Sequence, residues 1–159
     1  MKVFVSGAAG FVGSRLALAL LRRGDEVVGF DNFDPYYNPE LKNLHLRDVL
    51  HDANFTFVRG DLRDADLLKS VFERENFEAL AHIGAMAAVR YSVQNPLVYG
   101  QVNVQGTANL LDAARNTSKP TCVLASTGSV YGRDTPVSTV CRRRFCDFST
   151  FTARTGAPT

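Results

Sequence analysis

Short apolar runs alternate with helical patterns along the first 125 residues of the chain. The runs at 2–6, 26–30, 55–58, 79–83 and 121–125 predict buried strands of a parallel sheet, because such strands are apolar on both faces. Segments with apolar residues at helical spacing separate them, at 11–23, 39–50, 64–75 and 95–115. This alternation predicts an α/β fold, a Rossmann-type doubly wound parallel sheet of about five strands.

Helix-end residues support these boundaries. Arg22, Arg23 and Gly24 end the first predicted helix with positive charge and a glycine. The longest predicted helix begins with Asn95 as its cap and Pro96 in its first turn. Two glycines inside that helix, at 100 and 106, indicate close packing against a neighbour. Asp64 is placed to cap the helix over 64–75.

The periodic pattern ends near Val137. From Thr139 onward an Arg-, Thr- and Cys-bearing run has neither helical nor strand period. We therefore expect one folded domain over 1–137 and an irregular, disordered tail over 138–159. The folded part is then an incomplete sheet with an open edge and an uncovered apolar crevice, and without a C-terminal substrate lobe.

Composition excludes several classes of protein. With 45% hydrophobic and 21% charged residues in 159, the chain has the composition of one globular domain. No run is long enough for a membrane span or a secretory signal, so we expect a cytoplasmic protein with no membrane partner. The net charge of +2 comes from arginines near the end of the chain, which disfavours a nucleic-acid partner.

The cysteines do not indicate a metal site. Cys122 lies in an apolar run, as a reduced and buried thiol does, whereas Cys141 and Cys146 lack the close spacing of a zinc knuckle. We expect no bound metal.

A glycine triplet follows the first predicted strand and opens the first predicted helix. Gly7 permits the tight turn, Gly10 lets backbone N–H groups approach a pyrophosphate, and Gly13 lets the helix pack against the strand. Asp31 follows roughly 20 residues later, where a carboxylate accepts both adenosine ribose hydroxyls. No arginine stands in the glycine loop or just after Asp31 to balance a 2′-phosphate, so NAD is favoured over NADP.

Together with the glycine triplet, further motifs resemble the extended short-chain dehydrogenase/reductase family, specifically its nucleotide-sugar epimerases and dehydratases. They are Gly-Asp-Leu-Arg-Asp at 60–64, His-Ile-Gly-Ala at 82–85, Asn-Val-Gln-Gly-Thr at 103–107 and Ser-Thr-Gly-Ser-Val-Tyr-Gly at 126–132. The stretch 32–38, which leads to Leu41 and Lys42, and the stretch 89–92 are most similar to UDP-glucuronate 4-epimerases, with UDP-glucose 4-epimerases as near neighbours. The dehydratases carry an Asp-Glu pair where this chain has Gly128 and Ser129, which favours epimerisation at sugar C4.

The resemblance implies a set of NAD-binding residues. Asp61 and Leu62 would flank the adenine, residues 83–85 would line the nicotinamide-side ribose, and Asn103 would reach the phosphates. The alternatives are that Asp61 caps a helix, that Asn103 pins a loop, and that His82 is a satisfied strand-end residue. The full expected set is Gly7, Gly10, Phe11, Val12, Gly13, Asp31, Asn32, Asp61, Leu62, Ile83, Gly84, Ala85, Asn103 and Ala125.

The same resemblance implies that Thr127 and Ser126 are catalytic, contacting the sugar hydroxyl that is oxidised. Without the surrounding motif, they would be strand-end hydroxyls that satisfy backbone groups. The implied partners are a UDP-sugar substrate and a second copy of the chain, in a homodimer that uses helices including 96–115.

One feature of the family is missing. None of the five tyrosines begins a Tyr-x-x-x-Lys pair, and Lys119 is the last lysine. We therefore expect the NAD-binding portion of an epimerase, truncated after about Val137 by a shifted reading frame or a shortened gene, and inactive alone. The alternatives are a non-catalytic NAD-binding or interaction module that pairs through its open sheet edge, and a non-functional gene fragment.

Overall fold

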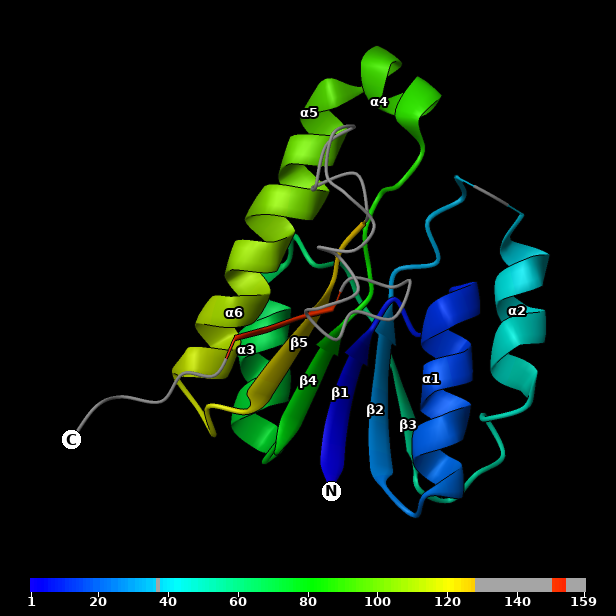
Figure 1. The fold of residues 1–159 in the computed structure, drawn as a ribbon, viewed down its shortest axis with the longest axis vertical. Coiled ribbons are helices and arrows are strands. Elements are labelled where there is room, and N and C mark those ends of the chain that lie inside the picture. Colours follow the sequence, from blue (N-terminus) through cyan, green and yellow to red (C-terminus); the bar gives the residue numbers. More distant parts are fainter. Residues whose placement is uncertain (37, 128–149, 154–159) are drawn as a thin grey trace, which may run out of the picture.

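The computed structural model describes residues 1–36 and 38–127 and the backbone of 150–153. It contains a six-stranded sheet of order β3-β2-β1-β4-β5-β6, with helices packed on both faces (Figure 1). The strands are β1 Lys2–Ser6, β2 Glu26–Asp31, β3 Phe55–Arg59, β4 Ala79–His82, β5 Thr121–Ala125 and β6 Thr150–Ala153. The helices are α1 Phe11–Arg22, α2 Pro39–Arg47, α3 Ala65–Arg74, α4 Val89–Gln94, α5 Pro96–Tyr99, the π-helical η1 Gly100–Gly106, and α6 Thr107–Arg115.

The first five strands are parallel, which confirms the predicted doubly wound sheet. β1 lies between β2 and β4, so the chain leaves it toward one edge and later crosses to the other side. In open sheets of this kind, ligands bind outside the carboxyl ends of the strands where the strand order reverses. The topology therefore predicts a ligand site among the loops that follow β1, β2 and β4.

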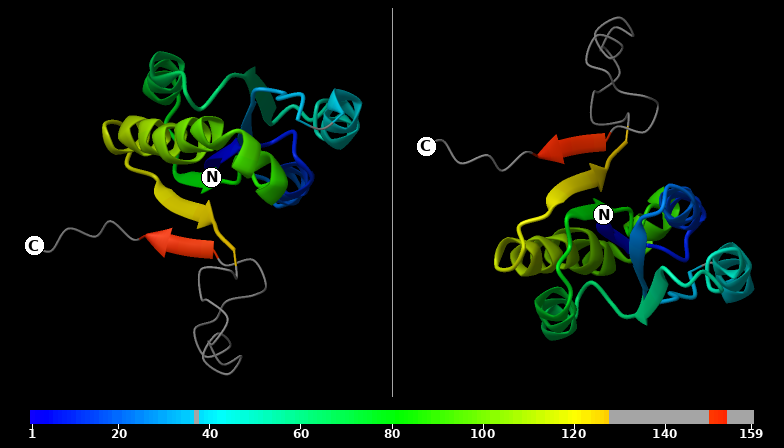
Figure 2. Two further views of the ribbon diagram at one scale, coloured as in Figure 1. Left: turned by 90° about the horizontal axis from the view of Figure 1, so that it is seen from above. Right: turned by 90° about the horizontal axis from the view of Figure 1, so that it is seen from below.

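Alternate residues of β1 point to opposite faces of the sheet and so divide the core in two. Phe4 belongs to a cluster with residues of α3 and α6, including Phe72 and Leu110. Val3 and Val5 belong to a second cluster with residues of α1 and α2, including Leu46. The views along the sheet show these two layers of helices on either side of the strands (Figure 2).

β6 differs from expectation. It pairs antiparallel with β5, with Cys122 opposite Ala153, inside the segment predicted to be irregular. The predicted open edge at β5 is therefore wrong, because β6 supplies the hydrogen-bonding partner there. Residues 128–149 and 154–159 lie outside the described residues, so the domain boundary at 137 and the order of the remaining tail stay predictions.

The long predicted helix over 95–115 forms as α5, η1 and α6 in direct succession. Its predicted cap is wrong, because the Asn95 side chain makes no cap bond and its amide instead donates to the Tyr91 carbonyl at 3.4 Å. By contrast, Asp64 caps α3 as expected, accepting from the Leu67 N–H at 2.9 Å.

The two glycines of this helix differ in their packing. Gly106 packs closely, since a Cβ there would lie 2.8 Å from the Leu62 Cβ, whereas a Cβ on Gly100 would meet nothing within 4 Å.

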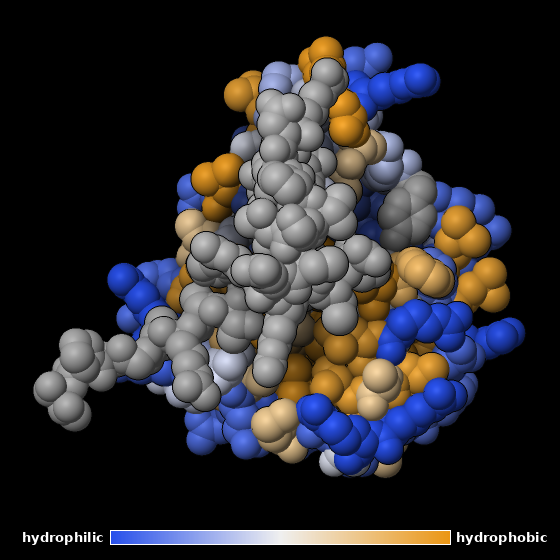
Figure 3. Space-filling view, viewed as in Figure 1, coloured by the Kyte–Doolittle hydropathy of each residue, from blue (hydrophilic) through white to orange (hydrophobic). Residues whose placement is uncertain are grey.

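Apolar side chains also reach the surface. Those left most exposed on α4, α5 and η1 are Val89, Val93, Leu97 and Val104. The space-filling view shows a further gathering of apolar residues low on the face that it presents (Figure 3). Among the described residues, no helix is long and apolar enough to cross a membrane.

Candidate functional site

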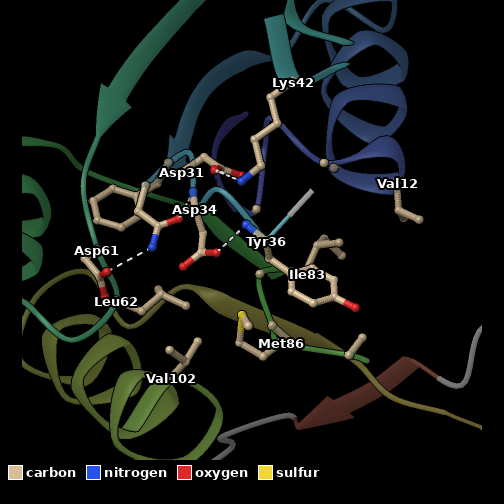
Figure 4. A pocket seen from close by; sticks show the side chains of 18 of the residues that line it. Val12, Asp31, Asp34, Tyr36, Lys42, Asp61, Leu62, Ile83, Met86 and Val102 are labelled. Atoms are coloured by element: carbon tan, nitrogen blue, oxygen red, sulfur yellow. Dashed lines mark hydrogen bonds and ion pairs between the residues drawn. The ribbon is translucent and has the colours of Figure 1, made fainter. Parts of the chain in front are cut away.

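A cavity of about 470 Å³ lies at the carboxyl ends of β1, β2 and β4 (Figure 4). All the expected cofactor residues except Asn103 and Ala125 line it. The cavity is lined by Gly7, Gly10, Phe11, Val12, Gly13, Phe30, Asp31, Asn32, Asp34, Tyr36, Lys42, Gly60, Asp61, Leu62, Ile83, Gly84, Ala85, Met86, Ala87, Ala88 and Val102.

The glycine turn after β1 is built without room for side chains. Gly7 has φ +70°, a conformation that favours glycine, and a Cβ on it would also lie only 2.7 Å from Gly84. Both the backbone conformation and the lack of space therefore require glycine at this position. A Cβ on Gly13 would lie 2.1 Å from the Gly7 carbonyl oxygen. The first turn of α1 can therefore lie directly on the loop only because Gly13 has no side chain.

The amino end of α1 is open to an anion. Its cap residue, Gly10, offers no side-chain hydrogen bond, and the first turn has no acidic residue. The first N–H groups of a helix have no partner within the helix and carry a partial positive charge. Phe11, Val12 and Gly13 bring these groups to the cavity wall, an arrangement that fits a pyrophosphate.

Asp31 ends β2 and is buried in the cavity wall. Its Oδ2 accepts from the Ala9 N–H at 3.2 Å, and its Oδ1 accepts from the Phe33 N–H at 2.8 Å. Lys42, from α2, donates to the same Oδ1 at 2.9 Å, and both side chains are buried. Sequence reasoning gave Lys42 no site role, because nothing in a local pattern shows that a helical lysine eleven residues later returns to this carboxylate.

Asp61 forms a second anchor of the cavity. Its carboxylate accepts from Arg63 through the backbone and the guanidinium, with contacts of 2.7–2.9 Å, and from the Asn32 amide at 2.9 Å. The Arg63 hydrogen bond holds the pKa of Asp61 well below its usual range. The carboxylate therefore stays charged and holds the Asn32 side chain in the cavity wall. It does not cap α3.

His82, at the end of β4, is buried in a hydrogen-bonded chain. The Ser6 hydroxyl accepts from the Ile83 and Gly84 N–H groups, each at 3.1 Å, so its own proton points to His82 Nδ1 at 2.6 Å. His82 Nε2 lies 2.9 Å from Thr107 Oγ1. Burial lowers the pKa of His82 to about 4, so the imidazole is neutral and links β1 to the loop after β4, as a satisfied strand-end residue does.

Asn103 lies outside the cavity wall and holds the loop after β4. Its amide donates to the Met86 carbonyl and accepts from the Met86 N–H, both at 2.8 Å. This is the loop-pinning alternative considered above. The phosphate contact for Asn103 stays a prediction.

The expected catalytic residues follow β5. Ala125 ends that strand, and Ser126 and Thr127 come next, exposed, at the same carboxyl edge of the sheet as the glycine turn. None of the three lines the cavity formed by the described residues. Gly128, Ser129 and the rest of the motif through 132 lie outside the described residues.

Three tyrosines to which the sequence analysis gave no site role form a row beside the cavity. The ring of Tyr36, which lines it, is 5.0 Å from that of Tyr91 in α4, and Tyr91 lies 6.3 Å from Tyr99. The Tyr99 hydroxyl donates to the Ala88 carbonyl at 2.6 Å. This aromatic row joins the loop after β2 to the loop after β4.

The described part of the chain holds no cluster of three or more side chains suited to a metal ion. Cys122 is half-buried, and burial raises the pKa of its thiol. Cys141 and Cys146 lie outside the described residues.

Comparison with known proteins identifies the family. The sequence pattern of the family described as GDP-mannose 4,6 dehydratase matches residues 4–144. The chain belongs to this family. It is 45% identical over 136 residues to UDP-glucuronate 4-epimerase 6 of Arabidopsis thaliana, an alignment that covers 85% of this chain and 29% of that relative. The chain thus spans about a third of the length of that curated relative.

Solved structures of epimerases share the fold. UDP-glucuronic acid 4-epimerase from Bacillus cereus, in complex with NAD, superposes with a TM-score of 0.73 at 31% identity, covering 85% of this chain and 43% of that one. UDP-glucose 4-epimerase from Stenotrophomonas maltophila, with bound NAD and formylated UDP-arabinopyranose, superposes with a TM-score of 0.74 at 27% identity. The superposition covers 86% of this chain and 40% of that one. Both of these epimerase structures contain bound NAD.

Proposed function

We propose that these 159 residues form the NAD-binding part of a nucleotide-sugar 4-epimerase of the UDP-glucuronate or UDP-glucose type. The observation that carries the proposal is the cavity itself, which brings the open amino end of α1, the glycine turn and Asp31 to one edge of the sheet. The similarity to UDP-glucuronate 4-epimerases supports the substrate class.

Each part of the cavity suits a part of the cofactor. The N–H groups of Phe11 to Gly13 would hold the pyrophosphate, Asp31 the adenosine ribose, and Ile83 to Ala85 the nicotinamide-side ribose. When bound, NAD supplies a hydride acceptor and donor for sugar C4. Thr127 and Ser126 follow β5 at the same edge of the sheet, where a UDP-sugar hydroxyl would meet them.

We further propose that the chain binds NAD without turning over substrate. In this family's chemistry a tyrosine paired with a lysine serves as general base, and no Tyr-x-x-x-Lys pair occurs in the sequence. Location in the cytoplasm and pairing with a second copy through helices including 96–115 are also part of the proposal, the latter favoured by the exposed Leu97 and Val104.

A non-catalytic NAD-binding module is the second candidate, and the missing pair favours it. Conversion of UDP-glucuronate by the chain in the presence of NAD tests the proposed lack of turnover. Any C4 epimerisation would contradict it, whereas NAD binding without conversion agrees with both candidates. Pairing through an open edge at β5 loses its support, because β6 lies there.

NAD binding is tested by thermal unfolding. At NAD tenfold above its dissociation constant, native-state binding adds about 1.4 kcal/mol, which raises the midpoint by about 3–6 °C. The variant Phe11→Asp should keep its fold, because Phe11 is exposed and an acid suits a helix amino end, yet it should lose most of the rise by repelling pyrophosphate.

The matched control is Phe11→Asn, which removes the same ring without adding charge and should retain most of the rise. Absence of any rise in a wild-type chain that unfolds cooperatively would rule out NAD binding.

A further inference from the structure

Two opposite charges share the wall where the adenosine ribose would lie. Lys42 Nζ is 2.9 Å from Asp31 Oδ1, and the two side chains are only 6% and 7% exposed. Both residues line the cavity. Figure 4 shows Lys42 descending from α2 to meet Asp31 at the end of β2. The pair is thus part of the site wall.

The neighbouring Phe33 helps to fix this arrangement. It adopts φ +57°, an uncommon backbone conformation for a bulky residue, and its N–H is held by Asp31 Oδ1. The Lys42 ammonium lies 5.7 Å from the centre of its ring, and the Arg59 guanidinium lies 5.4 Å from it. The turn at Phe33 and the contact between its ring and the Lys42 ammonium therefore help to hold Lys42 where it meets Asp31, and the Arg59 contact helps to hold the ring.

Hydrogen-bond capacity limits what Asp31 can do for a ribose. A carboxylate offers about four lone-pair positions. The Phe33 N–H and Lys42 take Oδ1, and the Ala9 N–H takes a position on Oδ2. About one position is left, so Asp31 cannot accept both ribose hydroxyls while these bonds persist. The expectation that Asp31 accepts both hydroxyls stays a prediction, and it requires that one of these bonds gives way when a ribose binds.

The same pair changes how the site treats a 2′-phosphate. Asp31 alone would repel it, but Lys42 lies beside Asp31 and would attract it over a comparable distance. We propose that Lys42 is a specificity-determining residue, and that the Asp31–Lys42 pair, rather than Asp31 alone, sets the preference between NAD and NADP. This inference rests on the proposed NAD-binding function.

The test measures dissociation constants of NAD and NADP by calorimetry on the whole chain and follows their ratio, so that contacts common to both cofactors cancel. Removing the cation in Lys42→Met should raise the ratio of the NADP to the NAD constant about tenfold or more. Removing the anion in Asp31→Asn should lower this ratio by a similar factor, because Lys42 then faces the 2′-phosphate without a competing carboxylate.

Two further variants complete the design. The double variant Asp31→Asn/Lys42→Met should return the ratio to within about threefold of wild type, because both charges are gone. Lys69→Met is the matched control, since it removes one exposed lysine of α3 outside the cavity, and it should leave the ratio unchanged. If Asp31→Asn fails to fold, the ratio of the NADP to the NAD dissociation constant in Lys42→Met alone tests the inference.

An unchanged ratio in folded Lys42→Met, with wild type binding NAD, would overturn this inference and leave the proposed function intact. If wild type binds neither cofactor, the proposed function fails and the inference fails with it.

Discussion

His82 shows how a single residue serves the site without touching a ligand. Its two ring nitrogens connect Ser6 of β1 to Thr107 of α6, and Ser6 in turn holds the N–H groups of Ile83 and Gly84. The Thr107 hydroxyl donates to the Asn103 carbonyl at 2.7 Å, so it accepts from His82 Nε2–H and fixes the neutral tautomer. The loop that lines the cavity after β4 is therefore anchored by an uncharged imidazole.

This burial predicts a pH dependence of stability. The unfolded chain protonates His82 near pH 6.5, whereas the folded chain resists protonation until about pH 4. Stability is therefore fully present above pH 6.5, falls as the pH drops toward 4, and loses about 3 kcal/mol from this group. Urea unfolding across that range should show the slope in wild type and in the control His51→Gln, and lose it in His82→Gln. An equal slope in His82→Gln would contradict the assignment.

Among residues, the glycine turn and Asp31 could be predicted from the sequence because their chemistry is local. Strand, turn and helix follow one another within a few positions, so the spacing of Gly7, Gly10 and Gly13 already implies the geometry. Lys42 could not be predicted this way, because its partner is set by how α2 packs back against the sheet. Asn103 likewise received a ligand role, while the structure shows it bonded to Met86.

Among elements, the parallel strands could be predicted because burial on both faces leaves continuous apolar runs. α4 was missed, since it is only six residues long and Val89 and Val93 on it are largely exposed. β6 was missed because its pairing depends on the distant edge of β5 and not on its own four residues.

The succession of α5, η1 and α6 offers a matched pair of glycines for an element-scale test. Gly100→Ala should stabilise the protein by about 0.5–1 kcal/mol, because its Cβ meets open space and alanine restricts the unfolded chain. Gly106→Ala should destabilise it by about 1–3 kcal/mol, because its Cβ would press on Leu62 Cβ at 2.8 Å. Denaturant midpoints measure both. Equal effects of the two substitutions would contradict the packing of η1 on the loop after β3.

At the scale of the whole molecule, the sheet places all its functional loops at one edge, while its two clusters of core side chains hold the layers together. The Phe4 cluster joins α3 and α6 to one face, and the Val5 cluster joins α1 and α2 to the other. The cavity lies where loops from both sides of β1 meet, so its shape depends on both clusters. A ligand bound there stabilises the whole domain and not one loop.

The edge of the sheet gives the last prediction. Successive N–H groups of a strand point to opposite sides, so alternate amides of β5 face β6 and are protected only if the two strands pair. Removing residues 150–159 should speed hydrogen exchange at alternate amides of 122–125 and leave β1, which lies between β2 and β4, slow. Removing only 154–159 is the control and should change neither strand. Unchanged exchange in β5 after the longer deletion would show that β6 does not cover this edge in solution. The edge would then be open to pairing with another chain, as the incomplete sheet predicted from sequence requires.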